Sequence, residues 1–385
     1  MDPRKRGRLA EDDDSLLFSC VVIRQKNFMK KHITFFLLLC LSFNTQAKPI
    51  IFDTDVAIDD WAALLYLLHH KNTQVIAVTI AATGEAHCKP AKENIASLLD
   101  LKTKKQIPIA CGDDYPLDGY FVFPQAWRTD SDKLSGVTIL KSKRIASDKH
   151  AADIIHDAIN KSKEPIIIVA TGPLTNIAQW LERYPQDKNK LAQLVIMGGT
   201  VDAPGNIIVP LFTPGHPNKT AEWNIFIDPL AADKVFAAGL PITLVGLDIT
   251  NTVRVTAKVA ADFKQATHTP AAKFWDQVLD KNDWFIASGE YYFWDTLAAM
   301  IAVEPSLCEG DTHHLKVAYS PTATPWQQTT DNSMPNTRWD GKPRQHLDAA
   351  TAGTLVKDET YSAIKVCRKT ETERIFREFR EVLNR

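Results

Sequence analysis

The acidic stretch Asp53-Thr54-Asp55-Val56-Ala57-Ile58-Asp59-Asp60 follows the short apolar run Pro49–Phe52 and precedes the apolar-periodic stretch Trp61–His69. The apolar run predicts a buried strand, and the periodic stretch predicts a helix. The alternation recurs, with strands expected at Gln74–Ala81, Pro108–Ala110, Ile166–Ala170, Leu194–Met197 and Ile242–Val245, and helices at Lys89–Leu101 and Thr175–Tyr184. This pattern predicts an α/β fold: an open, mostly parallel, twisted sheet with helices on both faces, Rossmann-like in architecture.

The composition is that of an ordinary globular protein, with 385 residues of which 45% are hydrophobic and 24% charged. Lys and Arg number 45 against 46 Asp and Glu, so the chain lacks the basic field that holds nucleic acid. No internal repeat or Pro/Gly/Ser-rich linker divides residues 48–385, which predicts one domain. Two polar stretches, 113–137 and 319–351, are expected to be long loops on this scaffold, and such loops often carry function.

The first 47 residues are expected to lie outside that domain. Residues 29–47 have the pattern of a secretory signal peptide: basic residues after Met29, the apolar run Ile33–Leu41, then small residues at Thr45 and Ala47. The run is too short to cross a bilayer, so we expect no stable membrane anchor. Residues 1–28 are charged and aperiodic, and we interpret them as a non-native or disordered extension upstream of Met29.

Cleavage near Ala47 would export the mature protein, to a periplasm or to the medium. Four cysteines would then remain in an oxidising compartment: Cys88, Cys111, Cys308 and Cys367. An even number permits disulfides, although the spacing leaves the pairing open and matches no zinc site.

The acidic stretch itself predicts a metal site. Its four carboxylates in eight residues repel one another unless a cation lies among them, and all-oxygen ligands favour Ca²⁺ or Mg²⁺. An EF-hand is excluded, because Ile58 stands where that loop needs Gly and Leu64 where it needs Glu. Charge at a helix N-terminus would explain Asp59 and Asp60 but not the two earlier acids. A haloacid dehalogenase-type phosphohydrolase also has a strand followed by D-x-D, but its second acidic pair comes late in the chain.

The stretch resembles the D-x-D-x-x-x-D-D fingerprint of the calcium-dependent nucleoside hydrolases, the inosine–uridine-preferring family. Further motifs of that family follow in order, over roughly residues 49–305: Thr171-Gly172-Pro173-Leu174-Thr175-Asn176-Ile177-Ala178, Met197-Gly198-Gly199 with Gly205-Asn206, Glu222-Trp223-Asn224, Gly246-Leu247-Asp248 and Trp294-Asp295-Thr296-Leu297-Ala298. The resemblance implies an enzyme that hydrolyses the N-glycosidic bond of nucleosides to free base and ribose. Its expected partner is a nucleoside, and a homo-oligomer stays open.

The resemblance also implies roles for individual residues. The Ca²⁺ ligands would be Asp55, Asp60, Asp295 and the backbone carbonyl of Thr171, and Asp55 would take a proton from a calcium-bound water. Ribose hydroxyls would be held by Asp59, Asn206, Glu222 and Asn224, while Met197 either lines the pocket or belongs to the core.

Three positions depart from the family pattern. Glu85 stands where Asn is usual, and it either reaches a ribose hydroxyl or is a solvated loop acid. Val56-Ala57 replaces Pro-Gly. Trp294 replaces the His that would protonate the leaving base, a role that indole cannot fill.

Trp294 and Trp223 instead resemble the purine-specific inosine–adenosine–guanosine branch, in which indoles sandwich the purine. The stretch Phe123–Arg128 resembles the loop that carries that branch's other stacking residue, here Trp127. Stacking is worth about 0.5–1.5 kcal/mol beyond burial and would ease protonation of the base. The alternatives are core packing for each Trp, a broad or pyrimidine preference, and a nucleoside-binding protein with poor turnover.

Overall fold

The computed structural model of the protein describes residues 47–323 and 344–385. The expected extension 1–28 and signal peptide residues 29–46 lie outside the described residues, as does the middle of the stretch 319–351. The strands are β1 Lys48–Thr54, β2 Thr73–Ile80, β3 Ile109–Cys111, β4 Ile166–Ala170, β5 Leu191–Met197, β6 Ile242–Val245, β7 Glu309–Val317, β8 Leu355–Lys357 and β9 Ala363–Lys369.

The helices are α1 Ile58–His69, α2 Cys88–Asp100, α3 Gln125–Asp132, α4 Ala151–Lys161, α5 Thr175–Arg183, α6 Trp223–Ile227, α7 Pro229–Ala237, α8 Leu247–Thr250, α9 Ala257–Ala266, α10 Pro270–Lys281, α11 Asp283–Ser288, α12 Trp294–Val303 and α13 Thr372–Leu383. Three short 3₁₀ turns join them: η1 Leu134–Gly136, η2 Pro185–Lys190 and η3 Pro305–Leu307. Within the described ranges, no helix is both long and apolar enough to cross a membrane.

The strands form one open sheet in the order β3-β2-β1-β4-β5-β6-β9-β7-β8. All neighbours from β3 to β9 are parallel, whereas β7 runs antiparallel to both β9 and β8. The predicted fold class is therefore confirmed, together with the six predicted strands. The prediction missed β7, β8 and β9, and the polar, largely exposed first half of β7 explains why.

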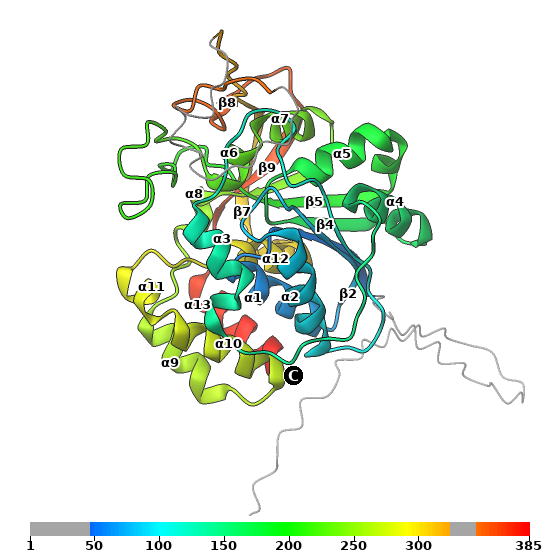
Figure 1. The fold of residues 1–385 in the computed structure, drawn as a ribbon, viewed down its shortest axis with the longest axis vertical. Helices are drawn as coiled ribbons and strands as arrows, with labels where there is room; N and C mark the ends of the chain where they lie inside the picture. Colours follow the sequence, from blue (N-terminus) through cyan, green and yellow to red (C-terminus); the bar gives the residue numbers. More distant parts are fainter. Residues whose placement is uncertain (1–46, 324–343) are drawn as a thin grey trace, which may run out of the picture. The chain divides into compact units, whose positions relative to one another are not determined.

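Two apolar layers cover the sheet (Figure 1). Helices α1, α2 and α12 pack on one face, with α10 and α13 against α1, and α4 and α7 pack on the other, with α5 between them. Side chains of β1 alternate between the layers, since Ile50 and Phe52 join the first and Ile51 the second. Trp61 and Trp180 are fully buried, one in each layer.

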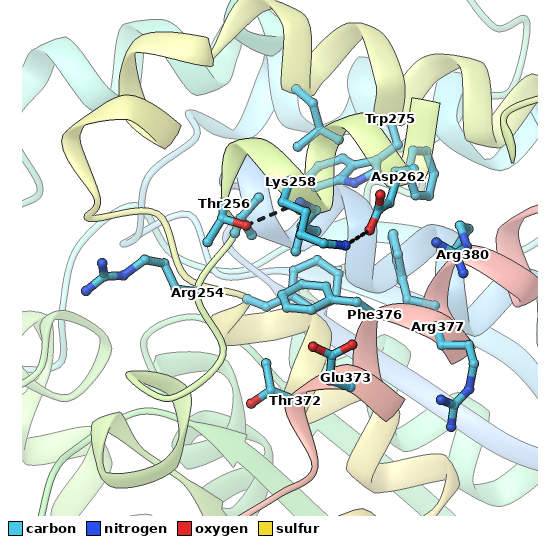
Figure 2. Close-up of a pocket in the computed structure, with 16 residues that line it drawn as sticks. Arg254, Thr256, Lys258, Asp262, Trp275, Thr372, Glu373, Phe376, Arg377 and Arg380 are labelled. Atoms are coloured by element: carbon cyan, nitrogen blue, oxygen red, sulfur yellow. Dashed lines mark hydrogen bonds and ion pairs between the residues drawn. The ribbon is translucent and has the colours of Figure 1, made fainter. Parts of the chain in front are cut away.

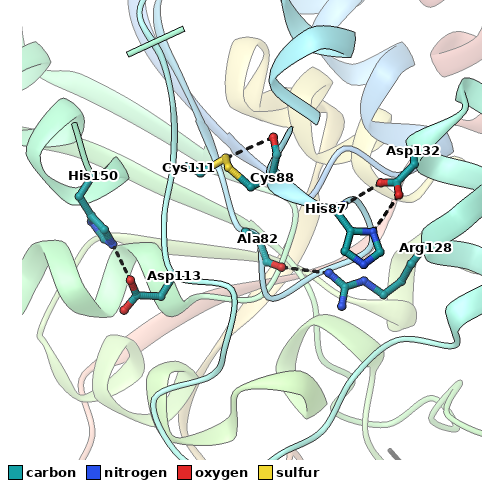
Figure 3. Close-up of a disulfide and its surroundings, with 8 residues drawn as sticks. All are labelled: Ala82, His87, Cys88, Cys111, Asp113, Arg128, Asp132 and His150. Carbon is teal, nitrogen blue, oxygen red and sulfur yellow. Dashed lines mark hydrogen bonds and ion pairs between the residues drawn. A yellow bond between two sulfur atoms is a disulfide. The ribbon is translucent and has the colours of Figure 1, made fainter. Parts of the chain in front are cut away.

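The four cysteines whose pairing the sequence left open form two disulfides. Cys88–Cys111 ties the start of α2 to the end of β3, and Cys308–Cys367 ties the segment before β7 to β9 (Figure 3 shows the first). The stretch 113–137 is not wholly a loop, because it contains α3 and η1. Its aromatic residues Tyr120 and Phe121 pack with Leu347, so the two long polar stretches meet in a third apolar cluster.

Candidate active site

The predicted site residues gather at the carboxyl edge of the parallel sheet. Asp55 follows β1, Glu85 follows β2, Thr171 follows β4, and Met197 ends β5. Asp59 and Asp60 occupy the first turn of α1, while Asp295 occupies that of α12. Parallel α/β sheets bind ligands at this edge, because the loops that follow the strands converge there.

Four buried carboxyls form the centre of the site: Asp55, Asp59, Asp60 and Asp295. Asp59, Asp60 and Asp295 each offer an oxygen, and these three oxygens lie within 4.8 Å of one another. Burial raises the pKa of Asp55, and Asp55 lies close enough to Asp60 for the proximity of the two carboxyls to raise it further. The resemblance implied Asp55, Asp60 and Asp295 as ligands, whereas the tightest oxygen group contains Asp59 in place of Asp55.

Asp60 is the most firmly held of the four. The hydroxyls of Thr54 and Thr171 donate to its Oδ1 at 2.5 and 2.6 Å, and the Ala57 amide donates to its Oδ2 at 2.8 Å. The bond from the Ala57 amide caps the N-terminus of α1. The alternative interpretation, an acid that only complements a helix N-terminus, therefore accounts for one of the contacts of Asp60. It does not explain why three other carboxyls share the same buried space.

Asp53 lies behind this group rather than in it. Its Oδ1 accepts from the Thr79 hydroxyl at 2.5 Å and from Asn176 Nδ2 at 2.8 Å. The first acid of the fingerprint therefore links β1, β2 and α5 below the site.

Burial raises the pKa of every carboxyl in the group, and their mutual repulsion raises most of them further. The pKa of Asp59 rises to about 7, and those of Asp55 and Asp295 rise well above their ordinary range. A divalent cation among these carboxylates would offset both the cost of burying their charges and their mutual repulsion. The donors are all oxygen, the set that Ca²⁺ and Mg²⁺ prefer, so the residues fit a hard cation.

We expect the metal-free protein to melt at a higher temperature near pH 5.5 than near pH 8. Eight carboxyls in and around the site have raised pKa values: Asp53, Asp55, Asp59, Asp60, Glu85, Glu222, Asp228 and Asp295. Their unfolded pKa is about 4. The folded state therefore binds protons more tightly than the unfolded state does. The contribution of these carboxyls to the free energy of unfolding is fully present below about pH 4 and is lost as the pH rises through about 7.

Two histidines act in the opposite direction, because burial lowers the pKa of His69 to about 4 and also lowers that of His70. The carboxyls outnumber these two histidines, so the melting temperature should still fall as the pH rises. Calorimetry in chelator checks this. A melting temperature that climbs steadily from about pH 5.5 to pH 8 would contradict it.

Three of the four predicted ribose residues lie on or beside α6, and the fourth, Asp59, lies on α1. Glu222 caps this helix: its carboxylate accepts the amides of Asn224 at 3.0 Å, Ile225 at 3.2 Å and Gly199 at 2.9 Å. Asn224 Nδ2 lies 3.2 Å from the Met197 carbonyl and 3.4 Å from that of Thr171. Asn206 Oδ1 accepts the Trp223 amide at 3.2 Å. The motifs after β4 and β5 are thus brought together.

The three predicted tryptophans fall into two aromatic groups. Trp127 packs edge-on to Trp223 at 5.4 Å between ring centres, and Trp223 is buried and stacks on Phe123. Trp294, half-buried at the start of α12, instead contacts Tyr291 and Tyr292. Among the ring contacts of the described residues, none joins Trp127 to Trp294. Trp223 therefore has the packed environment of a core residue, while the other two are partly exposed.

Glu85 is not a solvated loop acid in this structure. Its side chain accepts the Ser131 hydroxyl at 2.7 Å, and its amide donates to Asp55 Oδ2 at 3.1 Å. Burial raises its pKa to about 8. Sequence reasoning missed Ser131 and the neighbouring Arg128, although both lie in or just after the stretch that carries Trp127.

A separate cavity of about 320 Å³ lies between α9, α10 and α13 (Figure 2). Aromatic side chains such as Trp275 and Phe376 line it, with Arg377 and Arg380 among its charged residues. None of the predicted site residues contributes to its wall. The cluster of four buried carboxyls and this cavity therefore lie at different places in the molecule.

Comparison with known proteins agrees with the motifs. Residues 50–377 match the family described as inosine-uridine preferring nucleoside hydrolase. The chain is 32% identical over 235 residues to the pyrimidine-specific ribonucleoside hydrolase RihA of Citrobacter koseri, covering 61% of this chain and 71% of that protein. It is 33% identical over 241 residues to the RihA of Shewanella sp. strain MR-7, covering 61% and 70%.

Solved structures share the fold. The inosine-uridine preferring nucleoside hydrolase of Bacillus anthracis aligns with a TM-score of 0.68 at 23% identity, covering 88% of this chain and 99% of that one. The purine-preferring ribonucleoside hydrolase of Gardnerella vaginalis aligns with a TM-score of 0.67 at 24% identity, covering 88% and 98%. The chain belongs to the inosine-uridine preferring nucleoside hydrolase family and is, by that membership, a nucleoside N-ribohydrolase.

Proposed function

We propose that this enzyme is calcium-dependent and that it prefers purine ribonucleosides. The observation that supports the metal is the group of three buried carboxylate oxygens within 4.8 Å, formed by Asp59, Asp60 and Asp295, with the buried carboxyl of Asp55 close to Asp60. These residues and the Thr171 carbonyl would hold the ion. When bound, the ion supplies positive charge that acidifies water and neutralises the group.

The chain's own residues account for the remaining steps. Asp55 would hold the ion and would also accept the proton of the attacking water, because it is a buried carboxylate next to the other ion ligands. Asp59, Asn206, Glu222 and Asn224 orient the ribose, and Glu85 is placed to join them. The surrounding carboxylates would stabilise an oxocarbenium-like sugar as the bond to the base breaks, and solvent would protonate the departing base.

Purine preference is proposed from two aromatic side chains near the site, Trp127, which precedes the Arg128 that contacts Glu85, and Trp294, which precedes Asp295. Trp127 and Trp294 are half-buried, so each keeps a surface for a base to contact. A bicyclic base gains more from such contacts than a pyrimidine does. The competing proposal is a pyrimidine preference, favoured by the name of the RihA relatives.

Inosine should therefore show a higher kcat/KM than uridine, and Trp294→Ala should lower kcat for inosine by about tenfold. The effect should appear in kcat because the contact would strengthen as charge develops on the leaving base. Steady-state release of ribose from both substrates measures this. Trp284→Ala, an exposed tryptophan on α11, is the matched control. A better kcat/KM for uridine would overturn the purine proposal, and no ribose from either substrate would overturn the catalytic one.

We also propose that the protein is exported after cleavage near Ala47. The two disulfides among the four cysteines of the domain support this, because such bonds persist mainly in oxidising compartments. Sequencing the N-terminus of protein recovered outside the cytoplasm should give Lys48-Pro49-Ile50. An intact Met1 or Met29 on the active protein would refute this proposal.

A further inference from the structure

The loop after β2 wraps around Asp55. The Glu85 amide donates to Asp55 Oδ2 at 3.1 Å, and the Ala86 amide donates to the Asp55 carbonyl at 2.9 Å. Gly84 lies so close that a Cβ there would overlap the Asp55 side chain. The orientation of this carboxylate therefore depends on where the loop 82–86 sits.

Arg128, on α3, holds that loop from the other side. Its Nε donates to the Glu85 carbonyl at 3.1 Å and its Nη2 to the Ala82 carbonyl at 3.2 Å (Figure 3 shows the latter). Four carboxyls lie near enough to act on its charge, those of Asp132, Asp114, Asp55 and Glu85. Among the residues that the structure describes, no carboxylate accepts a hydrogen bond from this guanidinium. The guanidinium therefore donates its hydrogen bonds to the backbone of the loop.

Two more contacts fix α3 against the same loop. The Ser131 hydroxyl donates to Glu85 Oε2 at 2.7 Å. The Asp132 carboxylate contacts both the backbone amide and Nδ1 of His87 at 2.8 Å (Figure 3). Trp127 immediately precedes Arg128, so the helix that grips the loop is also the one that carries the predicted base-stacking residue.

We propose that Arg128 is a positioning residue for catalysis, which holds the loop 82–86 against Asp55 and sets Trp127 relative to it. This inference rests on the proposed function, in which Asp55 is the base and a metal ligand. A planar guanidinium can bridge two carbonyls at once, whereas a lysine ammonium is a single point charge. It also places a fixed positive charge beside the carboxyls that crowd the site.

The test compares Arg128→Lys and Arg128→Met with matched changes at Arg144. Arg144 also donates to two backbone carbonyls, those of Thr103 and Lys105 at the other end of α2, and it touches no predicted site residue. Unlike Arg128 it also pairs with a carboxylate, that of Asp100 at 2.9 Å, so its replacement should cost at least as much stability. The Arg128 variants should lose about 100-fold in kcat for inosine, since a displacement near 1 Å costs that much. Their calcium Kd, measured by isothermal titration, should weaken about tenfold. KM and the melting temperature should change no more than in the Arg144 variants.

A third readout needs neither metal nor substrate. Hydrogen exchange of the Glu85 and Ala86 amides, which donate to Asp55, should speed up in the Arg128 variants and stay unchanged in the Arg144 variants. Unchanged exchange, kcat and Kd would overturn the proposal, as would equal losses at Arg144. If the unmodified enzyme releases no ribose, the proposed function fails, and the exchange measurement still decides the role of Arg128.

Discussion

Asp295→Asn and Asp60→Asn should each abolish calcium binding and lower kcat/KM for inosine by about 1,000-fold, the upper range for one electrostatic contact. Each change removes a charged oxygen from the group that lies within 4.8 Å. Calcium at about 100 times its Kd should stabilise the unmodified protein by about 2.7 kcal/mol and the variants by far less. Titration calorimetry and thermal melts, with and without chelator, measure both effects.

Asp295→Asn should not destabilise the metal-free protein, whereas Asp60→Asn should, because an Asn side chain would turn its NH2 group toward at least one of the three donors that bond to Asp60. A buried carboxyl that is repelled by its neighbours costs free energy, and a neutral amide of the same shape removes that cost. The Asp295→Asn variant should therefore melt at or above the temperature of the unmodified protein in chelator. Asp280→Asn, an exposed position on α10, is the control. Full activity of the unmodified enzyme in excess chelator would contradict the metal role.

The sequence predicts the central sheet well because its strands are buried on both faces. Runs such as Ile166–Ala170 are continuously apolar, so they stand out without any knowledge of their neighbours. Strand β9, Ala363–Lys369, mixes apolar and charged residues and pairs with the polar β7 in an antiparallel edge region. Half-exposed strands of this kind leave a weaker signal than buried ones.

The motifs point to residues that the structure brings together, but they do not reveal the contacts among them. Motifs in chain order identify Asp60 and Asp295, which lie 235 positions apart, yet spacing alone cannot show that Asp59 completes the tight oxygen group. The disulfide partners are 23 and 59 positions apart and become identifiable only when the fold brings their Cα atoms to 5.9 and 5.4 Å. Arg128 was missed because its partners are backbone carbonyls, which leave no trace in a sequence.

Gly84→Ala should lower kcat for inosine by about 100-fold, because it displaces Asp55. A Cβ at Gly84 would overlap the Asp55 side chain, and a Cβ at Gly172 would lie 2.8 Å from Asp55 Cβ on a second side. Asp55 is fully enclosed in this narrow space, so it has little room to move away. The added methyl should also destabilise the fold by about 1–3 kcal/mol, the usual cost of overpacking.

Gly239→Ala is the control that separates the overlap of a Cβ at position 84 with Asp55 from the general backbone strain of replacing a glycine. Gly239 has a φ of +69°, which disfavours any side chain, but its nearest neighbour would be Ser362 Oγ at 3.5 Å, an ordinary contact. It follows α7, away from the predicted site residues, and its replacement should cost about 1–2 kcal/mol in stability and leave kcat unchanged. Steady-state kinetics and denaturant melts of both variants give the comparison. If Gly84→Ala kept full kcat, the enclosed position of Asp55 would not matter to the reaction, and the base would have to be another carboxyl of the group.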